Sequence, residues 1–497
     1  MSDRKLNTAR DTVIYMIAKI IEGIVGVVTL SVYTNFFTPS ITGTYNMIYT
    51  NIQVIAMVLI TALLQASVRY VNSYELEGNS KKFYSTVFFS WLILNLAIVF
   101  ILISAFFAAR YPFGESFAGF FSEYQPSWLM LGIAGVVTFN TAQLMLGIVS
   151  ARREIKTYLL LSLIAATGKL LIPVVLTKFY GANISWILIA IITCDLLTAV
   201  IASGKLRVFS KISLKHFSKP VFLVFAAYGL PLIGNIAAST IIGHADRYII
   251  TYHHTTAAAG IYIPNYNIAS AAFTMLIVAV SKGSYPNILK AWSMGQKEHA
   301  QALVSQAVRM FLLVAVPAVA GVFALAPMVS RIMFKPEYAE GYVVIGWVAL
   351  GLMFLGITEY SNKYWELNAK TKVIFRNSMI CAAINVTANL IFVPVYGYAA
   401  SAYALFACYL IYFLMSKLES RKYMKWSIKP AAYIRISASA IIMGIAVYLA
   451  SLAVTPDSKG MLFALVGLGA VIYAICLVVS GEVKSELNFI KKRLKKG

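Results

Sequence analysis

Hydrophobic residues recur along this chain in runs of about twenty, separated by short polar loops, between Asp11 and Ser480. A helix needs about 20 apolar residues to cross a hydrocarbon core of about 30 Å. The pattern therefore predicts an all-α polytopic membrane protein with about 14 transmembrane helices. The predicted segments are Thr12–Phe36, Tyr45–Ser67, Thr86–Ala108, Trp128–Ile148, Tyr158–Leu176, Ile184–Ala202, Pro231–Tyr252, Ala258–Val280, Val304–Leu325, Tyr342–Thr358, Ser378–Val395, Tyr398–Leu414, Tyr433–Leu452 and Met461–Val479.

The composition agrees with this pattern. Hydrophobic residues make up 60% of the chain and charged residues 12%, whereas soluble proteins carry about 25% charged residues. Lys19 and Glu22 interrupt the first apolar run, which argues against a cleavable signal peptide. The cysteines lie inside apolar segments, which favours packed thiols over a disulfide framework or a thiolate metal site. They are Cys194, Cys381, Cys408 and Cys476.

The positive charge orients the chain. Most of the 42 Lys and Arg residues lie in the N-terminal tail, in the loops after even-numbered segments and in the C-terminal tail. The positive-inside rule then places both termini in the cytoplasm. A net charge of +23 would suggest nucleic acid in a soluble protein. Here the cations flank the membrane, so anchoring and contact with anionic lipids explain them, and no nucleic-acid partner is expected.

The chain repeats internally at an offset of about 217 residues. Two parallel lobes of six helices are therefore expected, because the offset covers an even number of segments. The matching features are Gly43-Thr-Tyr45-Asn-Met-Ile-Tyr49 with Gly260-Ile-Tyr262-Ile-Pro-Asn-Tyr266, Gly78 with Gly295, and Tyr180-Gly181 with Tyr396-Gly397.

This repeat predicts the domain organisation. We expect an N-lobe (1–204), a basic cytoplasmic or interfacial linker (205–230), a C-lobe (231–429), two additional C-terminal helices (430–480) and a basic cytoplasmic tail (481–497). Pro231 and Gly234 are expected to break a linker helix from the seventh segment. Secondary transporters place their binding site in the cavity between such repeats.

Polar side chains at helical spacing mark two of the segments. A charged residue inside a spanning helix is costly, and it usually faces a wet interior. Asp11, Tyr15, Lys19, Glu22, Gly26, Thr29 and Tyr33 form one stripe on the first segment, and Asn235, Ser239, Gly243 and Asp246 form another on the seventh. These stripes are expected to line the cavity, with Lys19 and Glu22 close enough to pair.

Other intramembrane charges are Lys169, Asp195, Arg247 and Arg309. Structural alternatives remain open for all of them. Lys169 and Asp195 could form an ion pair with a purely structural role, and so could Lys19 and Glu22. Arg247 and Arg309 could extend to the membrane surfaces. Separately, a solvated loop face is expected after the tenth segment, at Glu359, Lys363 and Glu366.

The sequence lacks familiar catalytic motifs. Neither Gly-Lys pair, at 168–169 and 204–205, has the upstream glycine of a phosphate-binding loop, and no His-Glu-x-x-His motif occurs. His253 and His254 are not expected to bind a metal ion. We therefore expect neither an enzyme nor a cofactor or metal site, with energy supplied by a gradient, a membrane potential or downhill movement of substrate.

Several short motifs give the chain a recognisable signature. They are Gly-Leu-Pro-Leu-Ile-Gly (229–234), Asp246-Arg247-Tyr-Ile-Ile, Gly260-Ile-Tyr262, Phe-Phe-Thr-Pro-Ser-Ile-Thr-Gly-Thr-Tyr (36–45) and Pro394-Val-Tyr-Gly397. With them the chain resembles the bacterial polysaccharide flippases, the O-antigen and capsule repeat-unit exporters of the multidrug/oligosaccharidyl-lipid/polysaccharide exporter superfamily.

That resemblance implies a V-shaped, two-lobed transporter of the bacterial cytoplasmic membrane. It would move undecaprenyl-diphosphate-linked oligosaccharide to the outer leaflet by alternating access. Anionic lipids and the polysaccharide polymerase machinery are the other expected partners, and a monomer is expected. The diphosphate would meet Lys19, Lys169, Arg247 and Arg309, the sugars Tyr15, Tyr33, Asn235 and Tyr262, and a coupling ion Glu22, Asp195 and Asp246.

Three alternatives stay open. Fourteen segments also resemble the lipid II flippase of peptidoglycan synthesis. A multidrug antiporter of the same superfamily would favour an acidic or apolar lining, whereas the candidate lining here mixes both signs. A scaffold of a polysaccharide synthase complex would not need intramembrane charge.

Replacing Lys19 with Ala or Gln should stop export of the lipid-linked sugar while leaving the protein in the membrane, because the diphosphate would lose a cation. Export measured in cells beside membrane levels of the variant checks this. Normal export by a well-expressed variant would remove Lys19 from the site.

Overall fold

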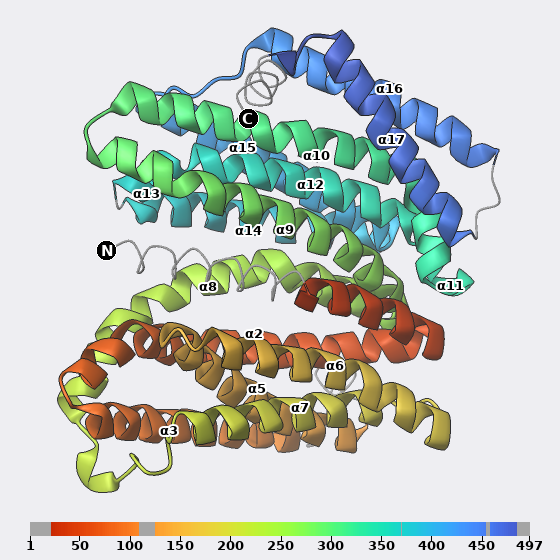
Figure 1. Cartoon of the computed structure of the whole chain (residues 1–497). Helices are drawn as coiled ribbons and strands as arrows, with labels where there is room; N and C mark the ends of the chain where they lie inside the picture. The colour runs from red at the N-terminus through yellow and green to blue at the C-terminus, as the bar shows by residue number, and fades with distance from the viewer. Residues whose placement is uncertain (1–20, 109–124, 369, 454–457, 485–497) are drawn as a thin grey trace. The chain divides into compact units, whose positions relative to one another are not determined.

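The computed structural model describes residues 21–108, 125–368, 370–453 and 458–484 (Figure 1). These ranges are helical apart from short turns and loops, and they contain no strand. The chain divides into two compact units, residues 1–260 and 261–497. Lys19 and Tyr15 of the predicted stripe lie outside the described residues.

The first unit consists of long helices that pack side by side. α2 packs against α5 and α8, and α7 packs against α5 and α6. Its elements are the helix Ile21–Phe36, α2 (Pro39–Leu76), α3 (Ser80–Ala108), α5 (Pro126–Ala151), α6 (Ile155–Tyr180), α7 (Ile184–Lys205), the 3-10 turn η2 (Leu214–His216), α8 (Lys219–His253) and the first residues of α9 (Thr256–Ser293).

The second unit follows the same helical plan and adds two helices at its end. α12 packs against α15 and α10, and α16 packs against α10 and α17. Its elements are the remainder of α9, then α10 (Lys297–Met333), α11 (Pro336–Ala339), α12 (Tyr342–Ser361), α13 (Lys363–Leu367), α14 (Thr371–Tyr396), α15 (Ala399–Ser420), α16 (Pro430–Leu452) and α17 (Lys459–Val479).

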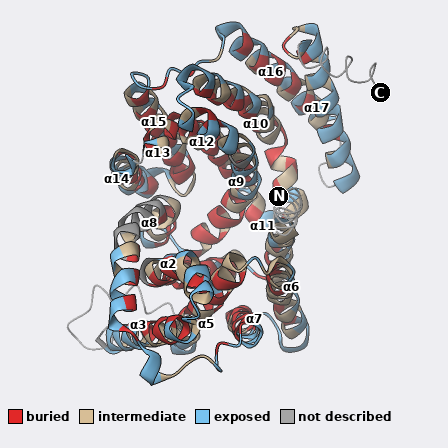
Figure 2. Ribbon diagram, turned by 60° about the vertical axis from the view of Figure 1, so that its left-hand side comes forward, coloured by how far each residue is buried: buried red, intermediate tan, exposed pale blue. Residues whose placement is uncertain are grey.

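Helix lengths and surfaces are those of a membrane protein. Among the described residues, 11 helices are long and apolar enough to cross a membrane, and α2, bent by 54°, makes a twelfth. Large apolar side chains cover the outer faces, including Phe100 (73% exposed), Phe463 (76%) and Val479 (82%), while buried residues face neighbouring helices within each unit (Figure 2). Because water disfavours such surfaces, they face lipid. The predicted all-α polytopic membrane fold is confirmed.

The linker differs from the expected one. α8 begins at Lys219 and continues to His253, so the expected break at Pro231 and Gly234 is wrong. Proline is tolerated within membrane helices because neighbouring groups satisfy the freed carbonyl. Only η2 interrupts the non-helical stretch from Leu206 to Ser218. The expected lobe boundaries stay a prediction.

Paired glycines show the internal repeat in the backbone. Gly78 and Gly295, just before α3 and α10, both have φ of +74°. Gly181 and Gly397, just after α6 and α14, have φ of +82° and +72°. These left-handed conformations disfavour any residue with a Cβ, which explains why glycine occupies corresponding turns in both halves.

A third glycine pair lies within the first unit. A Cβ at Gly43 would lie 1.8 Å from the Thr256 carbonyl oxygen, and a Cβ at Gly260 would lie 1.9 Å from that of Pro39. The start of α2 and residues 256–260 therefore pack backbone against backbone. The repeated Gly-x-Tyr motif thus marks a close approach that only glycine permits.

One cysteine pair departs from the expectation of packed thiols. Cys381 of α14 and Cys408 of α15 form a disulfide with Cα atoms 5.7 Å apart, whereas Cys194 and Cys476 are free. α14 and α15 pack directly against each other, and this Cα separation is within disulfide range. Hydropathy alone does not reveal which buried cysteines face each other.

Replacing Gly260 with Ala should lower the free energy of unfolding by about 1–3 kcal/mol, because the new methyl group overlaps a backbone oxygen that cannot rotate away. Thermal unfolding of the purified protein in detergent measures the change. Gly467→Ala is the matched control, since nothing lies within 4 Å of its new Cβ. Equal melting temperatures for the two variants would contradict the close approach.

Candidate functional site

A buried ion pair joins α6 and α7 in the first unit. Lys169 Nζ lies 2.6 Å from Asp195 Oδ1, and the two side chains are 22% and 5% exposed. Gly168 permits the close approach, because a Cβ there would lie 2.5 Å from the Cys194 sulfur. Lys169 and Asp195 therefore do pair with each other, as one of the alternatives predicted. Lys169 nevertheless keeps an accessible surface and two further N–H donors.

Tyrosines from two other helices surround this pair. The Tyr33 hydroxyl donates to the Lys169 carbonyl oxygen. The Tyr33 ring meets the edge of Tyr45 at 5.7 Å, and Tyr45 stacks on Tyr49 at 5.9 Å. We call Tyr33, Tyr45, Tyr49, Lys169 and Asp195 the Lys169 cluster. It combines a cation, a carboxylate and phenol groups on helix 21–36, α2, α6 and α7.

Arg247 of α8 binds α2 at the position that follows the cluster residue Tyr49. Its Nη1 donates to Thr50 Oγ1 at 2.8 Å, and its backbone N–H donates to Asp246 Oδ1 at 2.9 Å. The next residue, Tyr248, donates its hydroxyl to Asn51 Oδ1 at 2.5 Å. Arg247 is 8% exposed, and its extension to the membrane surface stays a prediction. Thr50 follows Tyr49 directly, which brings this second cation beside the Lys169 cluster.

One carboxylate oxygen in the cluster is left open. Asp195 Oδ2 is buried and has no hydrogen-bond partner among the residues that the structure describes. The Thr198 hydroxyl, three residues further along α7, is buried without a partner in the same part of the chain. This unsatisfied buried acceptor leaves room for a further hydrogen-bond donor at the site.

The other candidate residues lie elsewhere or in less defined surroundings. Glu22 is half-buried on helix 21–36, and the side chain of Asn235 lies outside the described residues. Tyr262 is fully buried in α9, with its ring 5.8 Å from that of Tyr266. Tyr262 and Tyr266 correspond to Tyr45 and Tyr49 in the repeat. Their predicted roles stay predictions.

Arg309 has a partner that sequence reasoning missed. Its Nε lies 2.8 Å from Glu482 Oε1, and its Nη2 donates to the Glu482 carbonyl oxygen at 2.8 Å. Arg435 Nη1 approaches Glu482 Oε2 at 3.8 Å. Glu482 lies in the segment predicted as a basic tail. These contacts link α10, α16 and the end of α17, while substrate binding by Arg309 stays a prediction.

The loop face expected after α12 is instead partly buried. Lys363 is 3% exposed, pairs with Glu366 at 2.7 Å and lies 5.1 Å from the centre of the Tyr285 ring. The expectation of a solvated face is therefore wrong for Lys363. The short helix α13 turns this side chain inward, which linear spacing does not predict. No group of three His, Cys, Asp or Glu residues suited to a metal ion occurs in the described ranges.

Comparison with known proteins identifies a family and a curated relative. The model of the "Polysaccharide biosynthesis protein" family matches residues 8–292. An uncharacterized membrane protein of Methanocaldococcus jannaschii is 24% identical over 257 residues, 48% of each chain, so the match spans about half the length of that curated relative.

Solved structures of transporters share the fold. The lipid II flippase MurJ in an inward closed conformation superposes with a TM-score of 0.73 at 18% identity, covering 94% of this chain and 99% of its own. An inward-facing multidrug resistance transporter of the MATE family gives a TM-score of 0.67 at 11% identity, covering 82% and 98%. At these identities the likeness concerns the fold.

A double-mutant cycle tests the ion pair. Asp195→Leu should lower the free energy of unfolding by about 2–4 kcal/mol, because it leaves Lys169 buried without its counter-charge, while partial exposure of Lys169 limits the cost. Lys169→Met combined with Asp195→Leu should recover most of that loss. Unfolding by SDS titration from mixed micelles provides the measurement. Simple additivity of the two single effects would show that the pair is not coupled.

Proposed function

Because this chain belongs to the polysaccharide biosynthesis protein family, we propose that it is a flippase for undecaprenyl-diphosphate-linked oligosaccharide. It moves the lipid-linked sugar from the cytoplasmic to the outer leaflet by alternating access. The observation that carries the proposal is the Lys169 cluster, a partly accessible cation within apolar helices. Intramembrane charge of this kind usually marks a pathway.

The diphosphate group is bound by Lys169 and Arg247 in this proposal. Ammonium and guanidinium groups form charge-assisted hydrogen bonds with phosphate oxygens. Without substrate, Asp195 neutralises Lys169 at 2.6 Å and Thr50 engages Arg247 at 2.8 Å. An entering diphosphate competes for both cations. Lys169 is thus charge-compensated and Arg247 is hydrogen-bonded when the site is empty, and both become available to an anion of sufficient charge.

The sugar is bound through weaker polar contacts. The hydroxyl groups of Tyr33, Tyr45 and Tyr49 and the amide of Asn51 offer donors and acceptors around the cations. Stacked phenol rings also suit the apolar faces of a sugar. The lipid tail remains in the bilayer.

Transport energy comes from the membrane potential or from an ion. A potential negative inside favours outward movement of an anion by about 2.3 kcal/mol per charge per 100 mV. Once Lys169 turns to substrate, Asp195 becomes a buried carboxylate with an open oxygen. Uptake of a proton or sodium ion there would restore neutrality, with Glu22 and Asp246 as further candidate sites.

A lipid II-type precursor flippase is the second candidate. It is favoured by the likeness to MurJ over 99% of that chain. Both substrates share a lipid diphosphate, so the Lys169 cluster would serve either. A multidrug antiporter exporting organic cations fits less well, because two buried cations would repel its substrate.

Lys169→Gln should reduce flipping of undecaprenyl-diphosphate oligosaccharide about tenfold or more, through loss of a charge-assisted contact. The measurement uses purified protein in liposomes, with and without an imposed potential and pH gradient, and with lipid II and an organic cation as competing substrates. Lys178→Gln is the matched control, because Lys178 is exposed in the last turn of the same helix.

Three results would count against the proposal. Equal flipping by the two lysine variants would remove Lys169 from the site. Faster movement of lipid II than of the oligosaccharide carrier would favour the second candidate. Proton-linked efflux of the organic cation, without movement of either glycolipid, would make the protein a drug antiporter.

A further inference from the structure

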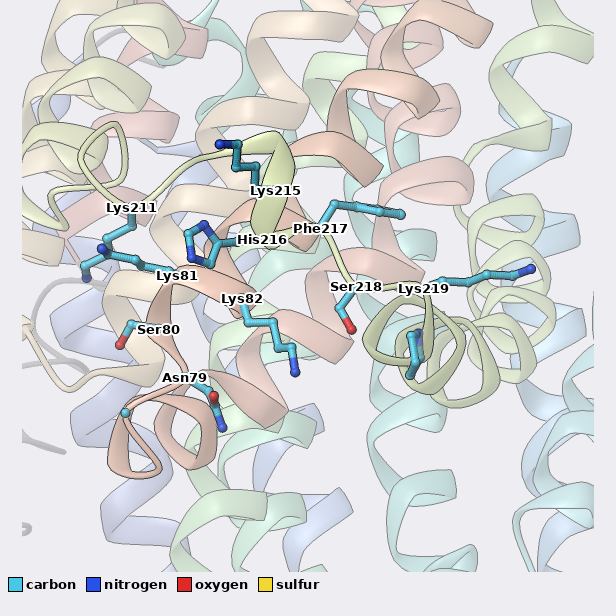
Figure 3. Close-up of a pocket in the computed structure, with 12 residues that line it drawn as sticks. Asn79, Ser80, Lys81, Lys82, Lys211, Lys215, His216, Phe217, Ser218 and Lys219 are labelled. Carbon is cyan, nitrogen blue, oxygen red and sulfur yellow. The ribbon is translucent and has the colours of Figure 1, made fainter.

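A second cationic site lies at one end of the first unit, far along the helices from the Lys169 cluster. It is a pocket of about 750 Å³ between the α2–α3 turn and the segment leading into α8 (Figure 3). None of the described residues that line it carries a carboxylate. Its basic residues are Lys81, Lys82, Lys211, Lys215, Lys219 and His216. We call it the lysine pocket.

Most of these lysines lack a counter-charge. Within the described ranges, no ion pair joins Lys81, Lys82, Lys215 or Lys219 to a carboxylate. Four uncompensated ammonium groups around one hollow produce a positive potential that attracts an anion.

Lys211 has a different role in the wall. Its Nζ lies 3.8 Å from Glu75 Oε1 and 4.3 Å from the centre of the Tyr84 ring, and it donates to the Leu206 carbonyl oxygen at 3.0 Å. Partial burial lowers the pKa of Lys211, and Glu75 acts in the opposite direction. This lysine is engaged in holding the segment in place, so the other four remain for a ligand.

Two helix N-termini point at the same hollow. α3 begins at Ser80 and α8 at Lys219, and neither first turn contains an acidic residue. Lysines at a helix N-terminus oppose the helix dipole. The unbonded N–H groups of a first turn bind anions, above all phosphate. A bound anion would therefore reduce the repulsion among the lysines. It would also offset the unfavourable interaction of these lysines with the dipoles of the two helices.

Hydrogen bonds fix the two walls against each other. Ser85 Oγ accepts from the Ser213 N–H at 3.0 Å and donates to the Lys211 carbonyl oxygen at 3.2 Å. Thr86 Oγ1 accepts from the Ser218 N–H at 3.2 Å. The segment is thus tied to α3 at three points, which makes the pocket a built feature.

The second unit has a comparable hydrogen bond between α10 and the loop that follows α15, but it has other residues at two of the lysine positions. There Ser305 Oγ accepts from the Ser427 N–H at 3.2 Å. At the repeat offset of 217, however, Glu298 and His299 stand where Lys81 and Lys82 stand in the first unit. The fold therefore forms without lysine at these two positions, although the α15–α16 loop carries the cations Arg421, Lys422 and Lys425.

The surroundings indicate a lipid ligand. Phe209, Leu214 and Phe217 on the same segment are 70%, 73% and 37% exposed. Basic residues interleaved with exposed apolar side chains are typical of segments lying at a membrane surface. We propose that the lysine pocket binds the phosphate headgroup of an anionic phospholipid, in the leaflet that the lysine distribution assigns to the cytoplasm.

The test compares lipid binding by two variants of equal charge. Lys81→Gln/Lys82→Gln/Lys219→Gln should weaken phosphatidylglycerol binding about tenfold, because several charge-assisted contacts are lost. Arg421→Gln/Lys422→Gln/Lys425→Gln, which removes three exposed cations from the α15–α16 loop, should bind within about twofold of the unmodified protein. Native mass spectrometry of the full chain in detergent counts the bound lipids, with phosphatidylcholine as the uncharged comparison.

Two outcomes would overturn the proposal. One is equal phosphatidylglycerol binding by the two triple variants. The other is displacement of the lipid by equimolar sodium pyrophosphate, which would assign the pocket to a soluble phosphate compound instead. Should the triple variant be produced poorly, Lys82→Gln and Lys219→Gln alone give the same comparison. This lipid binding does not depend on transport, so the binding test can succeed or fail independently of the test of flippase activity.

Discussion

The cost of placing charge in hydrocarbon governs how the polar residues of this protein are arranged. An ionised side chain at the centre of a bilayer costs several kcal/mol, so it survives only with partners or water. Lys169 has Asp195, Arg247 has Thr50, and Arg309 has Glu482. Each partner comes from a different helix. The same contacts that make these charges tolerable therefore also fix how the helices pack.

Glycine sets the second condition for this packing, because charges on neighbouring helices meet only when the backbones come close. Gly168 brings α6 against Cys194 of α7, beside the Lys169–Asp195 pair. Gly43 and Gly260 bring two backbones into direct contact. Lipid tails give helices no hydrophobic reason to associate, so small residues and interhelical hydrogen bonds supply the specificity.

Much of the fold could be predicted from the sequence, because spanning a bilayer imposes a length and a composition that a reader can count. Every predicted segment falls on a helix, though the first is described only from residue 21. The repeat was visible in the sequence because glycines recur at corresponding positions, and four of them have positive φ in the structure. The continuity of α8 through Pro231 was not predictable, because proline ends helices in water but not reliably in membranes.

The candidate site was only half predictable. Lys169, Asp195 and Arg247 stand out as charges in apolar runs, and their proximity follows from helix pairing. The role of Glu482 was not predictable, because this residue lies in a segment dominated by lysines. Its partner, Arg309, lies 173 residues away in the chain. The disulfide between Cys381 and Cys408 likewise depends on which faces of α14 and α15 meet.

The position of the Lys169–Asp195 pair also bears on how the chain enters the membrane during synthesis. Its two members lie on consecutive helices joined by the short turn 181–183. When α6 leaves the ribosome, Lys169 has no counter-charge, and its solvation in the translocon's lateral gate costs about 2.5–3.5 kcal/mol on insertion scales. That cost is offset once α7 has been synthesised and Asp195 can pair with Lys169. The two helices are therefore suited to enter the lipid together as a hairpin, with α6 staying at the translocon until α7 has been synthesised.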